Sequence, residues 1–188
     1  MNEYTYQQRL MGTDVVLSFV CAEEQQARTL AEELFTTIGA YESRFSRFLP
    51  DSELSQLNKN GSCVVSSTFM EVLTRSIELS QLTDGVFNPL TQVSRLGYTK
   101  SFSDLSKEQV AVTHGSYNTD STAVQIDQET NTVTLAPGQA LDFGGILKGY
   151  LASILANMVN DAHPECSGVI INIGGDIATR GYDELHEP

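Results

Sequence analysis

The sequence predicts an α+β domain that spans residues 1–188, because strand-like and helix-like segments follow one another without the strict alternation of a parallel α/β fold. Three stretches have the apolar spacing of amphipathic helices, namely 22–44, 67–82 and 146–159. Short β-branched or alternating stretches between them are typical of strands. The chain has 188 residues, of which 40% are hydrophobic, and this is enough to form a core of its own.

The first third of the chain begins as strand and continues as helix. Residues 4–20 are rich in Thr, Tyr, Val, Leu and Phe and predict two short strands or one bent strand, with Gly12 permitting the bend. The helix over 22–44 follows, with one apolar and one charged face. Residues 46–60 contain Pro, Asp, Ser and Asn and predict a loop with one helical turn at most.

The helix over 67–82 has recognisable ends. Thr68 and Glu71 have capping-box spacing at its start, and the Thr83-Asp84-Gly85 run stops it. Residues 97–121 are polar and weakly patterned, which predicts a surface segment.

The last third contains a hairpin, a helix and a strand. Residues 122–135 alternate around Glu129-Thr130-Asn131, as a hairpin does. The helix over 146–159 has a broad apolar stripe, which is normally buried on a sheet. Residues 169–173 form a compact apolar strand that ends in Gly-Gly-Asp.

The charge balance and the N-terminus exclude several classes of partner. The chain carries 24 acidic against 11 basic residues and no Lys or Arg run, so nucleic acid is not expected to bind. No apolar run approaches the ~18 residues of a membrane span, and no export signal is visible. As written, the sequence predicts a cytoplasmic location; a chain trimmed of its signal would instead work at the periplasmic face of the cell envelope.

The cysteines and histidines show no recognisable site spacing. Cys21, Cys63 and Cys166 lie far apart, so they suggest neither a disulfide framework nor a zinc site and are interpreted as buried or incidental thiols. The three histidines have no ligand spacing, and no Rossmann, P-loop or nucleophile-elbow motif occurs.

Four short segments are the most suited to chemistry: Met11-Gly12-Thr13, TDGVFNP at 83–89, LDFGGILKGY at 141–150 and NIGGD at 172–176. Each has a plain structural interpretation, because glycines at the ends of elements permit positive φ. The alternative is close approach to a ligand, since the N–H groups of Gly144, Gly145, Gly174 and Gly175 can lie against a phosphate or ribose.

Three charged residues in these segments also have two interpretations. Asp142 and Asp176 can be structural, as a helix cap and a turn residue. Lys148 lies in the first turn of its helix, where a cation is unfavourable against the helix dipole. This position favours a specific role for Lys148, such as pairing with an acidic neighbour or with a ligand group.

Together and in this order, the four segments resemble the signature of the ApbE family of FAD:protein FMN transferases. The family pattern has an MGT near its start, an amphipathic helix and a segment like FSRFLPDSELSQLN at 45–58. It continues with TDGxF(D/N)P, DxGxxxKGY and a strand ending in NxGGD. All of these are present between residues 11 and 176.

The resemblance implies an ApbE-like, T-fold-like mixed sheet flanked by helices, with FAD bound between a sheet and loops. It also implies Mg²⁺ at the pyrophosphate, and transfer of FMN from FAD to a threonine of an acceptor flavoprotein with release of AMP. In such phosphoryl-type transfer, positioning and charge neutralisation supply most of the catalysis. The alternatives are a non-catalytic FAD-binding module, an inactive truncated fragment, and a purely structural chain.

The resemblance also assigns site residues by their places in the motifs. Gly145 stands where relatives, which more often have Ala, give a backbone carbonyl to the metal. No catalytic residue is assigned. The residues expected to contact the nucleotide are Met11, Asn58, Asp84, Asp142, Lys148, Gly174, Gly175 and Asp176.

The family pattern continues beyond NxGGD, where a catalytic His and the side-chain metal ligands, an Asp and a Thr, are found. This chain is expected to lack that C-terminal portion, because His186 is not in such a motif and the given sequence ends at Pro188. The apolar strand over 169–173 is then expected to have an exposed edge. Such an edge predicts self-association or a second chain that completes the fold.

Overall fold

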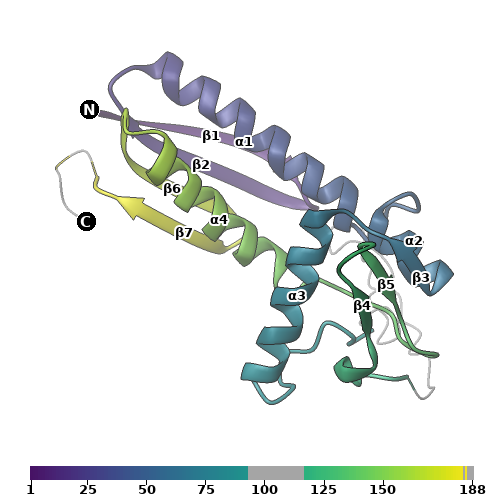
Figure 1. Ribbon diagram of the computed structural model, residues 1–188. Helices are drawn as coiled ribbons and strands as arrows, with labels where there is room; N and C mark the ends of the chain where they lie inside the picture. Colours follow the sequence, from purple (N-terminus) through teal and green to yellow (C-terminus); the bar gives the residue numbers. More distant parts are fainter. Residues whose placement is uncertain (93–116, 184, 186–188) are drawn as a thin grey trace, which may run out of the picture. The chain divides into compact units, whose positions relative to one another are not determined.

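The computed structural model of the chain describes residues 1–92, 117–183 and 185 (Figure 1). Helices and antiparallel sheets are both present, which confirms the predicted α+β class. Every strand pairing in this part is antiparallel, where the resemblance implied a mixed sheet. The surface segment expected over 97–121 lies mostly outside the described residues. Within the described part, no helix is long and apolar enough to cross a membrane.

The chain forms two compact units, one of which is discontinuous in sequence. Unit 1 combines Met1–Glu42 with Ile146–Pro188, and unit 2 consists of Ser43–Gly145. Unit 2 is therefore inserted, along the chain, between the two parts of unit 1. The prediction that residues 1–188 form a single domain stays a prediction.

Unit 1 contains a four-stranded sheet in the order β1-β2-β6-β7. The first hairpin confirms the two-strand alternative for the N-terminal segment. Pairing of β2 with β6 sets Leu17 opposite Ile171 and Phe19 opposite Val169. The strands are β1 (Asn2–Leu10), β2 (Thr13–Cys21), β6 (Cys166–Ile173) and β7 (Asp176–Gly181).

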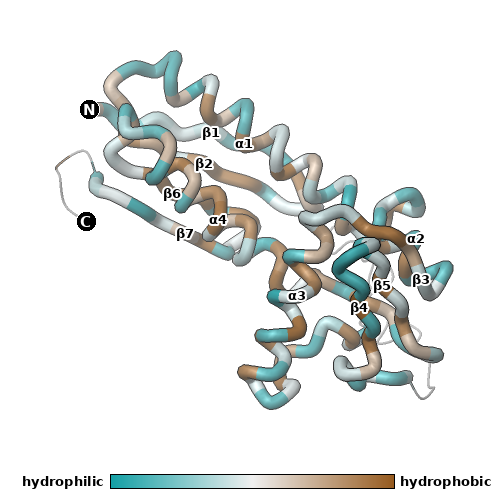
Figure 2. The backbone as a smooth tube through the Cα atoms, in the orientation of Figure 1, coloured by the Kyte–Doolittle hydropathy of each residue, from teal (hydrophilic) through white to brown (hydrophobic). Residues whose placement is uncertain are grey.

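Two helices cover one face of this sheet, α1 (Glu24–Phe45) and α4 (Leu147–Ala162) (Figure 1). Alternate residues of β2 and β6 point to the same face and share one buried cluster with Leu34 of α1 and Leu151 of α4. Figure 2 shows this as hydrophobic colour along β2, β6 and α4, whereas β1 is more polar. The apolar stripe predicted for the last helix is therefore buried on a sheet, as expected.

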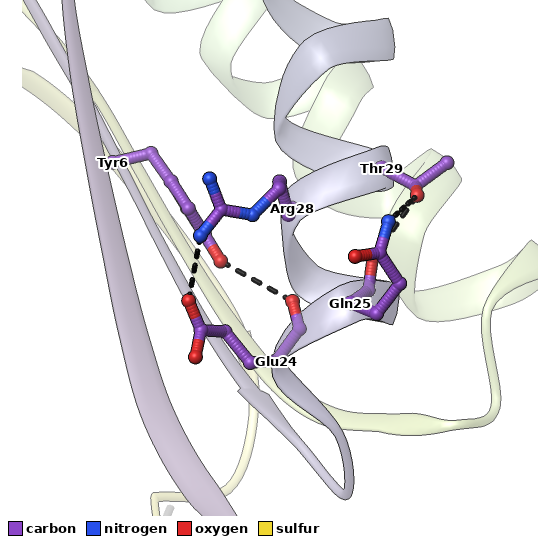
Figure 3. A network of polar contacts seen from close by, with 5 residues as sticks. All are labelled: Tyr6, Glu24, Gln25, Arg28 and Thr29. Carbon is purple, nitrogen blue, oxygen red and sulfur yellow. Dashed lines mark hydrogen bonds and ion pairs between the residues drawn. The ribbon is translucent and has the colours of Figure 1, made fainter.

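A small polar network joins the start of α1 to β1 (Figure 3). The Tyr6 hydroxyl donates to the backbone carbonyl of Glu24 at 3.3 Å, and the Arg28 guanidinium lies 6.0 Å from the Tyr6 ring centre. Arg28 also pairs with the Glu24 carboxylate at 2.7 Å. Burial raises the pKa of the Tyr6 hydroxyl above its ordinary value.

The apolar strand over 169–173 does not form an exposed edge, contrary to the expectation from sequence. Strand β6 pairs with β2 on one side and with β7 on the other. The residues after the Gly-Gly-Asp run thus supply a further strand, and β7 takes the edge position in the described sheet. Self-association stays a prediction.

The cysteine interpretation was wrong for two of the three residues. Cys21 and Cys166 form a disulfide across a sequence separation of 145 residues. Both lie in the buried cluster of unit 1, at the end of β2 and the start of β6. Closing so long a loop stabilises the folded state by about 5 kcal/mol in the chain-entropy treatment. Cys63 is a free thiol.

The described part of unit 2 contains two helices and a three-stranded sheet in the order β3-β5-β4. The hairpin predicted over 122–135 is confirmed as β4 and β5. A single 3-10 turn, Ser121–Ala123, precedes it. The elements are α2 (Glu53–Asn60), β3 (Ser62–Val64), α3 (Ser67–Leu82), β4 (Gln125–Asp127) and β5 (Thr132–Thr134).

Two local predictions in unit 2 were wrong. The segment 46–60, interpreted as loop with one helical turn, contains the two-turn helix α2, whose N-cap Ser52 accepts a hydrogen bond from the Ser55 N–H at 3.0 Å. The predicted capping box at Thr68 is not used. Instead Ser66 caps α3 by accepting from the Phe69 N–H at 3.2 Å, so the helix starts one residue before Thr68.

Three aromatic rings pack against one another in unit 2. Phe45 stacks on Phe69 with ring centres 5.3 Å apart, and Phe143 meets both edge-on. All three side chains are buried. This cluster anchors the segment that leads into the Gly144-Gly145 pair.

Two tight turns in unit 1 require positive φ. Met11 and Gly12 join β1 to β2 with φ of 54° and 70°, and Gly174 and Gly175 join β6 to β7 with φ of 64° and 101°. At Gly174 space is limiting as well, since an added Cβ would lie 2.6 Å from the Thr13 Oγ1. Gly175 faces open space.

The disulfide predicts a specific alkylation pattern. Denatured but unreduced protein is expected to take up one alkyl group, at Cys63, and three after reduction. Reductant is expected to lower Tm by roughly 10–20 °C, because the long loop is released in the unfolded state. Cys63→Ser serves as the control and leaves both the disulfide and the Tm shift unchanged. Three alkyl groups before reduction contradict the disulfide.

Gly174→Ala is expected to destabilise the protein by about 2–3 kcal/mol, because the new methyl group meets Thr13 at a strained φ. Gly175→Ala has a positive φ but no steric neighbour, so it is expected to cost about 1–2 kcal/mol from backbone strain alone. Urea unfolding measures both. Thr13→Ala in the Gly174→Ala background should recover part of the loss, and equal losses for the two glycines would refute the steric explanation.

Candidate functional site

The predicted site residues fall into two sets, one in each unit. In unit 1, the register of β2 with β6 places Val15 opposite Ile173, so both tight turns lie at the same end of the sheet. Helix α4 begins at this end as well, since an added Cβ on Gly149 would lie 3.9 Å from the Asp176 carboxyl carbon. Unit 1 thus brings together Met11, Lys148, Gly174, Gly175 and Asp176.

The glycine N–H groups of this turn donate hydrogen bonds within the protein, and a contact of Gly174 and Gly175 with a nucleotide stays a prediction. The Gly174 N–H donates to the Asp14 carbonyl at 3.0 Å. The Gly175 N–H donates to the Asn172 Oδ1 at 2.8 Å. The glycines serve turn geometry and close packing, and Asn172, which was not predicted as a site residue, holds the turn.

Met11 occupies an unusual backbone conformation for its residue type. A non-glycine residue with a φ of 54° is uncommon, and such positions concentrate at functional sites. Its side chain is half-buried against the core cluster of unit 1. The contact with the flavin nucleotide that the resemblance implied stays a prediction.

The start of α4 leaves backbone donors available. Its N-cap Ile146 makes no side-chain capping bond, so the N–H groups of the first turn have no side-chain acceptor there. Lys148 is half-buried, and no ion pair joins it to another described residue. Asp176 is exposed beside this first turn. The arrangement provides N–H donors, one cation and one carboxylate at a single edge.

In unit 2, three of the predicted motifs meet at one stretch of backbone. The Asn58 amide donates to the Leu141 carbonyl at 2.9 Å and accepts from the Leu141 N–H at 2.7 Å. The next N–H, of Asp142, donates to the Pro89 carbonyl at 2.7 Å. Asn58 therefore holds the segment before Gly144 rather than presenting a free amide.

The Asp142 carboxylate is also engaged within the protein. One oxygen accepts from the Gly144 N–H at 2.8 Å, which forms a tight Asx turn. The other lies 3.4 Å from the Arg47 Nη1. The expected role of the Gly144 N–H as a phosphate donor is thus not available, while Gly145 remains exposed.

Asp84 and Phe87 belong to a turn fixed by Thr83. The Thr83 hydroxyl accepts from the Phe87 N–H at 3.1 Å and donates to the Leu79 carbonyl at 2.9 Å. Asp84 has a φ of 49° and an exposed side chain. The Phe87 ring lies beside Gly145, where an added Cβ would be 3.3 Å from it.

The described residues do not form a side-chain metal site. Within that part of the chain, no group of three or more His, Cys, Asp or Glu side chains is placed to hold an ion. Gly145 is exposed, so its carbonyl can supply one oxygen ligand. Mg²⁺ requires six, which waters and ligand phosphates often complete.

Comparison with known proteins gives a consistent result. The ApbE family profile matches residues 11–188. The FAD:protein FMN transferase of Klebsiella pneumoniae is 27% identical over 189 aligned positions, which cover 95% of this chain and 56% of that protein. The FAD:protein FMN transferase of Haemophilus influenzae is 24% identical and is covered to 48%.

Solved structures agree on the fold. The flavinyl transferase ApbE of Pseudomonas stutzeri superposes with a TM-score of 0.81 at 16% identity, over 100% of this chain and 60% of that one. The flavin transferase ApbE of Vibrio cholerae gives 0.77 at 20% identity, over 100% and 62%. The chain thus spans 48–56% of the length of the two transferases matched by sequence. With its profile match from residue 11 onward and this shared fold, the chain belongs to the ApbE family.

Proposed function

We propose that this chain is an FAD:protein FMN transferase and that its described residues serve to recognise FAD. The observation that carries the proposal is the convergence of three family motifs on the backbone at Leu141 and Asp142, through Asn58 and Pro89. A second set of motif residues gathers at the sheet end of unit 1. The relatives from Klebsiella and Haemophilus carry this activity in their names.

The proposed reaction transfers FMN from FAD to a threonine of an acceptor flavoprotein. The threonine oxygen forms a bond to the FMN phosphorus, and the bond from that phosphorus to the bridging oxygen breaks. AMP leaves with the bonding electrons, and the threonine proton passes to a base that is not assigned among the described residues. In this chemistry a protein contributes mainly position and charge neutralisation.

The roles proposed for this chain's own residues are binding and orientation. The first turn of α4 offers uncapped N–H donors and the positive end of its dipole to a phosphate. Lys148 adds a cation in that turn, and Asp176 an acceptor for a ribose or amide hydrogen beside it. Met11, Asp84 and the Gly174-Gly175 turn are proposed to line the nucleotide.

The proposal also includes a bound Mg²⁺, for which this chain offers one ligand. The Gly145 carbonyl is proposed to provide one ligand, and a bound Mg²⁺ would neutralise pyrophosphate charge. The described side chains do not complete such a site, so no step is assigned to it.

Self-association through the edge strand β7 is also proposed, because pairing with a second chain would complete the sheet.

The disulfide supports a proposal about location. Disulfides persist in oxidising compartments and are rare in the cytosol of mesophiles. The Cys21–Cys166 disulfide is buried and joins the two sequence parts of unit 1. We therefore favour the cell-envelope side over the cytoplasmic location expected from the sequence as written.

FAD binding and AMP release test the function separately. The purified chain is expected to quench FAD fluorescence on binding. With Mg²⁺ and a threonine-containing acceptor, it is expected to release AMP, measured by chromatography. Lys148→Gln should weaken FAD binding by roughly tenfold through loss of a charge-assisted contact. Lys59→Gln, an exposed lysine at the end of α2, is the charge-matched control and should have no effect. Binding without AMP release would favour a non-catalytic FAD-binding module. A chain that binds no FAD would refute both the transferase and the FAD-binding module.

Thiol trapping in the native cells tests the location. Cells quenched with acid and alkylated at once are expected to show one modified cysteine, Cys63, because the other two are already oxidised. The readout is the mass of the intact chain. Modification of all three cysteines would place the protein in a reducing compartment and refute the proposed location.

A further inference from the structure

Arg47 and Asp142 form a largely buried charge pair beside the Gly144-Gly145 turn. The Arg47 Nη1 lies 3.4 Å from an Asp142 oxygen, and the two side chains are 23% and 15% exposed. Both residues belong to unit 2, and the chain as a whole has a net charge of −13. Burial makes this pair less screened by salt than a surface pair would be.

The Arg47 side chain is held by charge and by an aromatic ring. Its guanidinium carbon lies 4.7 Å from the centre of the Phe48 ring, within cation–π distance. Its Nη1 is buried and has no hydrogen-bond partner among the described residues. A buried guanidinium nitrogen without a hydrogen bond is unfavourable, and the ion pair with Asp142 offsets part of that cost.

The backbone that carries Arg47 is fixed on its N-terminal side. The carbonyl of Ser46 accepts hydrogen bonds from the Ser52 hydroxyl at 2.7 Å and from the Ser55 hydroxyl at 3.4 Å. These bonds tie the residue before Arg47 to the start of α2. Arg47 is therefore presented to Asp142 from a rigid segment.

Asp142 in turn controls the glycine turn. Its Oδ1 holds the Gly144 N–H at 2.8 Å, and Gly145 follows, exposed. Without Arg47, the Asp142 carboxylate would be an uncompensated negative charge three residues from Gly145. A phosphate-bearing ligand that approached Gly145 would then be repelled.

We propose that Arg47 is a positioning residue that neutralises Asp142 and keeps it directed at Gly144, so that a pyrophosphate can approach the Gly144-Gly145 turn. The ligand part of this inference rests on the proposed function. The substrate class concerned is a flavin nucleotide carrying phosphates, and the role of Asp142 becomes support of the turn rather than direct contact with the nucleotide.

The first experiment compares a charged and an uncharged flavin. Arg47→Gln is expected to weaken FAD binding by roughly tenfold but riboflavin binding by less than about twofold, because riboflavin has no phosphate. Adding Asp142→Asn to Arg47→Gln should restore most of the FAD affinity, since the uncompensated carboxylate is gone. Arg47→Lys keeps the charge and should retain near-normal binding.

Arg44→Gln is the matched control. Arg44 pairs with Glu53 in the same unit at 2.7 Å, with 29% and 30% exposure, and within the described part of the chain it makes no bond to the glycine turn. Its loss should not change the ratio of FAD to riboflavin affinity. Equal weakening of both flavins by Arg47→Gln, or no rescue by Asp142→Asn, overturns the proposal and leaves Arg47 a purely structural residue.

A ligand-free experiment separates this inference from the proposed function. A double-mutant cycle of Arg47→Gln and Asp142→Asn in urea unfolding should show that the double variant loses less stability than the sum of the single variants. Additive losses overturn the positioning role even where FAD binds. A wild-type chain that binds no FAD refutes the proposed function and the ligand part of the inference, whatever the cycle shows.

Discussion

The pairing of β2 with β6 is the constraint on which unit 1 depends. It joins residues 13–21 to residues 166–173 across the whole of unit 2 in sequence. The antiparallel register sets the odd-numbered apolar side chains of both strands on one face, where α1 and α4 cover them. The same register places two tight turns at one end of the sheet and two cysteines at the other. The core of unit 1, the set of site residues that lies in unit 1 and the disulfide all follow from one strand pairing.

In unit 2 the motif residues act mainly on one another. Asn58 holds Leu141, Asp142 holds Gly144, and Thr83 holds Phe87. A motif that is associated with a ligand therefore contains residues that shape the backbone as well as residues that touch the ligand. Within the described contacts, the side chains of Asp84 and, in unit 1, of Lys148 and Asp176 hold no other motif residue, and Gly145 is exposed.

Local patterns in the sequence predicted local structure well. The apolar repeat over 67–82 gave helix α3 at its full length, and the alternation around Asn131 gave the β4–β5 hairpin. Helix α2 was missed because its eight residues contain two buried leucines, too few to show a period. Strand β7 was missed because Asp-Ile-Ala-Thr-Arg-Gly has little strand propensity of its own and depends on β6.

Long-range features could not be obtained from spacing. A separation of 145 residues between Cys21 and Cys166 carries no sign that they pair. The partners of glycine N–H groups were also beyond a sequence argument, since a Gly-Gly pair is compatible with ligand binding and with a turn. The sequence identified the site as a set of motifs. The separate roles of the motif residues became clear only from the contacts of Asn172, Asp14 and Arg47 in the structure.

The disulfide has one more consequence, which concerns chain cleavage. Because unit 2 lies wholly between Cys21 and Cys166, a protease that cuts anywhere within it would leave both fragments covalently linked. The two sequence parts of unit 1 would stay joined at β2 and β6 even in a nicked molecule. The sheet of unit 1 would therefore stay together after cleavage of unit 2.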